Sequence, residues 1–161
     1  MRNDFSFATN TLQVKLTNPE SMPIRAHPTD AGADLRATTS YSIYPNEQKT
    51  IGTGVAVKIP EGYVGLVFSR SSMGKVAVTL ANSVGVIDAD YRGEIKVMIK
   101  NYGEDIFRVE VGDRIAQLVI CPIVTPEFVA FTGEDEAWSK TSRGLGGFGS
   151  SGKTYVARPI F

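Results

Sequence analysis

The chain is built around residues 85–94, Gly85-Val86-Ile87-Asp88-Ala89-Asp90-Tyr91-Arg92-Gly93-Glu94. An apolar run at residues 76–80 leads into this stretch, and Ile95, Val97 and Ile99 alternate with polar residues after it. The pattern predicts a β-hairpin, two strands joined by an elaborated tip. A hairpin needs only a short turn, whereas this tip carries carboxylates, an aromatic ring and a cation. Taken alone, a loop of this composition is more often simply solvated. The rest of the chain favours the interpretation that this loop carries a functional site.

The remainder of the chain consists of short runs with β-type alternation. They cover residues 12–16, 41–44, 50–59, 63–68, 106–111 and 115–124, and Gly, Pro and Asn turn signals separate them. No stretch has a long helical period, so we expect an all-β domain, a sandwich or a barrel, in which residues 50–59 form one strand. The core is expected at about residues 11–130, and the polar residues 134–143 are expected to form a mobile segment.

Composition limits the partners that the chain is expected to have. Lysine plus arginine and aspartate plus glutamate both number 17 among the 161 residues. A net charge near zero argues against broad binding to nucleic acid or to membranes, so neither is expected as a direct partner. Any anionic ligand is then held by a few placed cations. The length fits a single domain spanning residues 1–161.

The predicted compartment is the cytoplasm. The single cysteine, Cys121, cannot form an internal disulfide and is expected to be a small buried residue in an apolar run. The first residues, 1–10, are polar and mixed rather than like a signal peptide, and no apolar run is long enough to span a bilayer.

The C-terminal residues 139–161 are expected to form a flexible, glycine-rich arm. Residues 144–152 contain five glycines, flanked by the charges of Arg143 and Lys153. Residues 147–154 also match the nucleotide-binding P-loop pattern, but that loop needs a preceding strand and a following helix, and Pro159 leaves no room for the helix. An arm that closes over a ligand, stacking Phe148 and gripping phosphate, is one interpretation. A plain flexible tail is the alternative.

Five segments, taken in order, resemble the five motifs of the trimeric dUTPase family. They are Asp30-Ala31-Gly32-Ala33-Asp34-Leu35, Ser69-Arg70-Ser71-Ser72, Gly85 to Gly93, Gly112-Asp113-Arg114-Ile115-Ala116-Gln117-Leu118, and Arg143 to Gly152. Each alone is weak, whereas all five in order are specific. The resemblance implies a jelly-roll-like β-barrel, a homotrimer, and sites at subunit boundaries that a neighbour's C-terminal arm completes.

The activity that the resemblance implies is dUTP diphosphatase. Water attacks the α-phosphate of dUTP and gives dUMP and pyrophosphate, which keeps uracil out of DNA and supplies dUMP for dTMP synthesis. Asp88 resembles the carboxylate that activates the water, Gln117 the glutamine that helps to place it, and Asp34 the acidic residue that orients an arginine or waters on Mg²⁺. The alternative for Gln117 is a polar residue at a strand edge.

The resemblance also implies the residues that hold the substrate. Arg70 and Ser71 resemble the phosphate-binding pair, a role that suits a guanidinium because it can engage phosphate with two hydrogen bonds. Tyr91 resembles the ring that packs under deoxyribose and rejects a 2′-hydroxyl. The other expected substrate-binding residues are Ser72, Asn82, Gly85, Ile87, Lys96, Met98, Arg143, Phe148, Gly149 and Ser150. Among these, Asn82 and the backbone near Lys96 and Met98 are expected to read the edge of uracil, and Arg143 and Phe148 to reach the γ-phosphate and cover the base.

Mg²⁺ is the expected cofactor, bound mainly through substrate phosphates and water, so no residue is named as its ligand. The sequence departs from the family pattern at Ala33, Ser69 and Ser72, which leaves details of base and phosphate packing open. The nearest rival is a dCTP deaminase, and Met98 stands where that family carries a catalytic glutamate. A regulatory binding protein built on the same scaffold is a second alternative, so a regulatory protein partner stays open.

Overall fold

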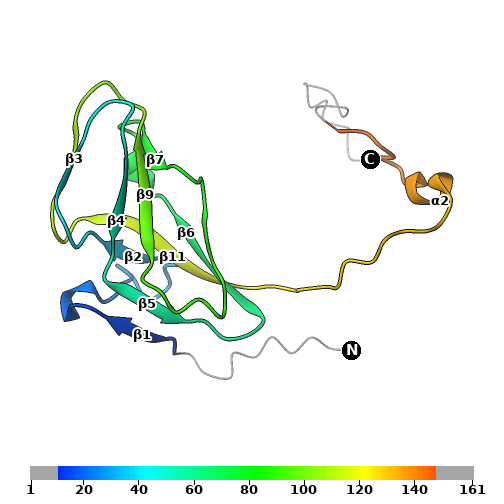
Figure 1. Cartoon of the computed structure of the whole chain (residues 1–161), viewed down its shortest axis with the longest axis horizontal. Helices are drawn as coiled ribbons and strands as arrows, with labels where there is room; N and C mark the ends of the chain where they lie inside the picture. The colour runs from blue at the N-terminus through cyan, green and yellow to red at the C-terminus, as the bar shows by residue number, and fades with distance from the viewer. Residues whose placement is uncertain (1–10, 148–161) are drawn as a thin grey trace, which may run out of the picture. The chain divides into compact units, whose positions relative to one another are not determined.

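The structure is a computed structural model that describes residues 11–147 (Figure 1). The chain divides into two units, one that ends at Thr125 and one that begins at Pro126. Within the described residues, no helix is long and apolar enough to cross a membrane. In chain order, the elements are β1 (Gln13–Leu16), a 3-10 turn η1 (Pro19–Ser21), β2 (Ala33–Arg36), β3 (Tyr41–Ile43), β4 (Gln48–Gly52), β5 (Val55–Lys58), β6 (Tyr63–Phe68), α1 (Ser71–Gly74), β7 (Val78–Leu80), β8 (Gly85–Ile87), β9 (Lys96–Asn101), β10 (Phe107–Val109), β11 (Arg114–Pro122) and α2 (Asp135–Ser139).

Within residues 11–147, the strands form four antiparallel sheets around one core, so the all-β prediction is confirmed. Their orders are β1-β5, β10-β3, β2-β11-β6-β8 and β4-β9-β7. Every sheet contributes to one hydrophobic cluster, for example through Val57, Ile43, Leu35 and Ile99. Alternate side chains of β9 are buried, as expected for a strand with one face on a core.

The predicted pairing of the two hairpin strands is correct, but the predicted loop between them contains a further strand. β7 pairs with β9, with Leu80 opposite Ile99. The intervening chain does not simply loop back, because it forms β8, which pairs with β6 in a different sheet. A Cβ at Gly85 would lie 3.1 Å from the Cβ of Val67, so glycine lets these two strands approach closely. The connection between β7 and β9 therefore takes part in a second sheet.

Two other expectations need correction, and the prediction of a mobile segment at residues 134–143, where the structure shows a short helix, stays untested. Residues 50–59 form two strands, since the chain bends at Thr53 and Gly54, and Gly54 takes a φ of 69° that suits glycine. Cys121 is half-buried, because it lies near the end of β11 and not in the centre of the core. Residues 134–143 include the short helix α2, in a unit where the rings of Phe131 and Trp138 have centroids 5.0 Å apart.

Candidate active site

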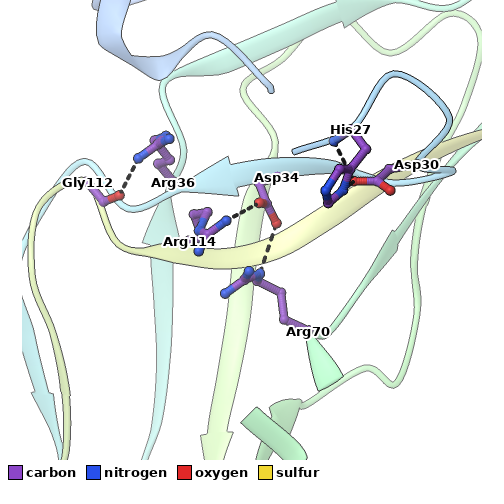
Figure 2. Close-up of polar contacts among 7 residues, drawn as sticks. All are labelled: His27, Asp30, Asp34, Arg36, Arg70, Gly112 and Arg114. Carbon is purple, nitrogen blue, oxygen red and sulfur yellow. Dashed lines mark hydrogen bonds and ion pairs between the residues drawn. The ribbon is translucent and has the colours of Figure 1, made fainter. Parts of the chain in front are cut away.

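Asp34 on β2 holds two arginines at one end of the β2-β11-β6-β8 sheet (Figure 2). Its Oδ1 accepts a hydrogen bond from Arg70 Nε at 2.9 Å, and its Oδ2 accepts one from Arg114 Nη1 at 3.1 Å. The Asp34 side chain is 16% exposed, whereas Arg70 and Arg114 keep 26% and 45% of theirs exposed. One carboxylate thus fixes two guanidinium groups that still face solvent, an arrangement suited to an anionic ligand.

The loop before β2 is tightened by hydrogen bonds to Asp30. Its carboxylate accepts the backbone N–H of His27 at 2.9 Å, and Arg25 Nε donates to the Asp30 carbonyl at 2.8 Å. The hydrogen bond from the His27 backbone is the main cause that lowers the pKa of Asp30. This loop leads directly into Gly32 and the strand that carries Asp34.

Gln117 lies beside this arginine pair. It stands on β11 opposite Asp34 on one side and Phe68 on the other, so it is not at a sheet edge. Its Nε2 donates to the Ser69 carbonyl at 3.1 Å. A Cβ added to Gly32 would lie only 2.4 Å from Gln117 Oε1, so the amide packs directly on that glycine. The amide is therefore oriented by the Ser69 carbonyl, just after β6, and by the Gly32 backbone.

We expect Gly32→Ala to lower kcat for the expected hydrolysis of dUTP by roughly 10–100-fold. The new methyl group would displace the Gln117 amide, which is expected to place the attacking water, and catalysis is sensitive to small displacements of such groups. Steady-state kinetics together with a thermal melt will check this. Gly74→Ala is the matched control, since a Cβ there meets nothing within 4 Å. Equal activity of the two variants would contradict the positioning of Gln117 by Gly32.

A second group of predicted residues surrounds a cavity of about 310 Å³ next to the connection between β8 and β9. Its lining includes seven of them: Asn82, Gly85, Ile87, Asp88, Tyr91, Lys96 and Met98. Thr50, Val86, Glu94 and Ile95 complete the lining. The volume is near the lower end for small-molecule sites, which suits a nucleoside better than a polymer.

Within this cavity, the Met98 carbonyl is already engaged, since it accepts the Ala81 N–H at 2.8 Å. Asp88 follows β8 directly and is exposed, and it also borders a neighbouring hollow lined by Glu61 and Tyr63.

The two groups lie apart within one copy of the chain. Along β6, Gln117 is level with Phe68, whereas Ile87, just before Asp88, is level with Gly65. Three residues along a strand and two strand spacings across put Asp88 roughly 14 Å or more from Gln117. The roles expected for Asp88 as a general base and Gln117 as a water-placing amide require both side chains to reach one water within hydrogen-bond distance. Within one copy the two groups are separate, and we call them half-sites.

The remaining predicted residues lie beside the arginine half-site, in the second unit, or outside the described part. Ser71 and Ser72 begin α1 and are exposed, and Ser72 borders a hollow of about 370 Å³ that Arg70 and Arg114 also line. Arg143 lies in the second unit, where its Nε donates to the Gly146 carbonyl at 2.9 Å. The predictions for Phe148, Gly149 and Ser150 fall outside the described residues.

Five residues of these half-sites were not predicted as site residues, namely Arg114 and the cavity-lining residues Thr50, Val86, Glu94 and Ile95. Arg114 lies within the fourth quoted segment, but nothing in its local pattern separates it from Arg36 or Arg108. Glu94 closes the quoted central stretch, and its backbone and side-chain contacts became visible only in the fold. Residues 11–147 contain no group of three or more His, Cys, Asp or Glu side chains that could hold a metal ion.

The fold and these half-sites define a class, a small β-barrel protein with a nucleoside-sized cavity and, separately, a pair of fixed arginines. The profile of the dUTPase family matches residues 18–152. The deoxyuridine 5′-triphosphate nucleotidohydrolase of Leifsonia xyli is 40% identical over 148 residues, which cover 91% of this chain and 94% of that protein. The chain belongs to the dUTPase family, as its sequence motifs predicted.

Solved structures agree with this assignment. The dUTPase of Staphylococcus bacteriophage 80alpha with dUpNHpp is 40% identical with a TM-score of 0.79, and the match covers 89% of this chain and 99% of that one. A mutant dUTPase from phage phi11 of S. aureus with a structural Mg(II) ion is 36% identical with a TM-score of 0.71, over 78% of this chain and 99% of that one. The predicted jelly-roll-like β fold is confirmed.

Proposed function

We propose that the chain is a dUTP diphosphatase that converts dUTP and water into dUMP and pyrophosphate. The observation that carries the proposal is the cavity beside the β8–β9 connection, where Asp88, the expected base for the attacking water, and six residues expected to bind dUTP line one nucleoside-sized space in a member of the dUTPase family. The proposal includes the metabolic consequence, which is a low dUTP pool and a supply of dUMP, and a cytoplasmic location.

In this proposal, Asp88 takes the proton of the attacking water. The water oxygen forms a bond to the α-phosphorus while the bond to the bridging oxygen breaks, so pyrophosphate leaves and dUMP remains. General-base help of this kind contributes roughly 10²–10⁴-fold. Gln117 orients the same water. Arg70, Ser71 and the unforeseen Arg114 hold phosphate oxygens, because phosphoryl transfer depends mainly on positioning and on charge stabilisation.

The nucleoside end is proposed to occupy the cavity. Asn82 and the backbone near Lys96 and Met98 read the uracil edge, with Gly85 and Ile87 along the strand beside it. Tyr91 packs under deoxyribose. In the C-terminal arm, Arg143 reaches the γ-phosphate and Phe148 covers the base, while Gly149 and Ser150 are further substrate-binding residues of the arm.

Mg²⁺ is proposed to bind to the substrate and not to a protein cage. Both oxygens of the Asp34 carboxylate accept hydrogen bonds from arginines, so this residue supports arginine positioning better than metal ligation. Mg²⁺ typically keeps several waters and binds through substrate phosphates, where it neutralises their charge.

A homotrimer is proposed because one copy presents two separated half-sites, which a second copy would bring together. The exposed apolar residues of the second unit support assembly, since Phe128 is 96% and Val129 81% exposed, and neighbouring large apolar side chains that are exposed together mark contact surfaces.

A regulatory protein partner remains a further proposal. Pull-down from source lysate with wild type and Asp88→Asn, each with and without dUTP, will test it.

The activity is tested by pyrophosphate release with Mg²⁺ from dUTP, UTP, dTTP and dCTP in parallel. We expect release from dUTP alone. Ammonia released from dCTP would instead favour a deaminase, and no release from any nucleotide by the folded protein would favour a regulatory binding protein.

A further inference from the structure

Tyr91 is held in one orientation at the rim of the cavity by its own loop. Its hydroxyl donates to the Glu94 backbone carbonyl at 2.9 Å. A Cβ added to Gly93 would lie 2.4 Å from Tyr91 Oη and 2.6 Å from Cζ, so the phenol end of the ring lies close to a glycine that leaves room for it. The orientation of the ring therefore depends on where residues 93 and 94 are placed.

The Glu94 side chain fastens this loop to the bend between β4 and β5. Its Oε1 accepts the backbone N–H of Gly54 at 2.7 Å, and the contact is partly buried. A Cβ added to Gly52 would lie 2.7 Å from the same oxygen, so the carboxylate fits between two glycines of the bend. Hydrogen bonds to a charged acceptor are roughly twice as strong as neutral ones, which makes this a firm attachment.

The bend itself is a rigid support. Thr53 Oγ1 donates to the Ile95 carbonyl at 2.7 Å, and Ile95 N–H donates to the Val55 carbonyl at 2.8 Å. Thr53 and Ile95 are 0% and 1% exposed. Among the residues that the structure describes, Arg92, in contrast, donates only to the carbonyls of Ala89 and Tyr91 within its own loop. Glu94 thus connects the bend between β4 and β5, through its side chain, to the loop that carries Tyr91.

We propose that Glu94 is a positioning residue for sugar selection: its carboxylate, bound to the Gly54 N–H, fixes the Tyr91 ring so that the cavity accepts deoxyribose and excludes ribose. This inference rests on the proposed function. Rejection of a hydroxyl by contact with a ring is steric, and close packing makes it sensitive to small displacements of that ring. A loop released from Gly54 lets the ring withdraw and admits the 2′-hydroxyl.

The test compares kcat/KM for dUTP and for UTP in matched variants. Glu94→Ala removes the attachment, and we expect the dUTP-to-UTP ratio to fall by about tenfold or more, the size expected for losing a hydrogen bond to a charged group. Glu94→Gln is expected to restore the ratio, because an amide oxygen can accept the same N–H. Tyr91→Phe is expected to give a smaller fall, because the ring remains while its bond to the Glu94 carbonyl is lost.

Glu47→Ala is the control for a purely structural effect. The Glu47 carboxylate is also half-buried, and it accepts the Tyr44 N–H at 2.8 Å in a turn outside the cavity lining. We expect a similar change in melting temperature for Glu47→Ala and Glu94→Ala, with the nucleotide ratio altered only in the latter. If Glu94→Ala does not fold, Glu94→Asp replaces it, since its carboxylate is one methylene too short to reach Gly54.

An unchanged ratio of kcat/KM for dUTP to that for UTP in Glu94→Ala or Glu94→Asp overturns the inference. A Glu94→Gln variant that discriminates between the two nucleotides no better than those variants also overturns it.

Dissociation constants for dUTP and UTP analogues with an imino group between the α- and β-phosphates separate this inference from the activity. If the wild-type protein hydrolyses neither nucleotide, the proposed function fails, and the ratio of dissociation constants still decides the inference. Equal binding of both analogues by the wild-type protein overturns it.

Discussion

Asp88→Asn is expected to lower kcat for dUTP by about 10²–10⁴-fold, the usual contribution of general-base catalysis, and to leave nucleotide binding intact. An amide keeps the shape of the carboxylate but cannot take the proton of the attacking water. Asp88 is exposed, and its side chain has no hydrogen-bond partner among residues 11–147, so the fold is not expected to depend on it. Steady-state kinetics and calorimetric titration with the imino analogue of dUTP measure the two effects separately.

Asp90→Asn is the matched control for this variant. Asp90 is an exposed carboxylate on the same loop, two positions further along, and it does not line the cavity. We expect it to retain activity close to that of the wild-type protein. A loss as large as that of Asp88→Asn would assign the effect to loop charge, and full activity of Asp88→Asn would remove Asp88 from the mechanism.

Truncation after Ser142 is expected to lower kcat/KM for dUTP by roughly 10²–10⁴-fold and to spare the fold. The expected losses are an arginine–phosphate contact of Arg143 and the stacking of Phe148 on the base, each of which contributes about 1–3 kcal/mol. The unit that ends at Thr125 has its own hydrophobic cluster, so the melting temperature should stay close to that of the full chain. Kinetics and a thermal melt measure both quantities.

Two single substitutions refine the truncation. Arg143→Gln should account for part of the loss, whereas Lys140→Gln removes an exposed cation from the same segment and should have little effect. A truncated protein that does not fold would contradict the independence of the first unit. A truncated protein with full activity would exclude any catalytic part for the arm.

Most of the strands were predictable from the sequence because their side chains alternate between a buried and an exposed face. Residues 63–68 form β6 with the predicted limits, and the pairing of β7 with β9 was also foreseen. The break at Gly54 was not, because an apolar alternation continues across it and a glycine alone does not reveal a positive φ. The position of β8 was also missed. It pairs with β6, in a different sheet from its sequence neighbours β7 and β9, and local patterns do not specify which strands pair.

The candidate site was predictable as a set of residues but not as an arrangement. Seven of the eleven residues that line the cavity were predicted from the sequence, yet the separation of Asp88 from Gln117 follows from strand order and register. The bonds of Asp34 to Arg70 and Arg114 join segments far apart in sequence, as does the bond of Glu94 to Gly54. Such contacts depend on tertiary packing, which periodicity does not encode.

Subunit mixing tests most directly whether one dUTP site combines half-sites from two copies. Asp88→Asn and Arg70→Gln each damage a different half-site, and each is expected to be nearly inactive alone. When the two are denatured together in equal amounts and refolded, random association should give about a quarter of the sites two intact halves, with pyrophosphate release near a quarter of the wild-type rate. If the refolded mixture forms assemblies and stays at the level of the separate variants, a site shared between copies is contradicted.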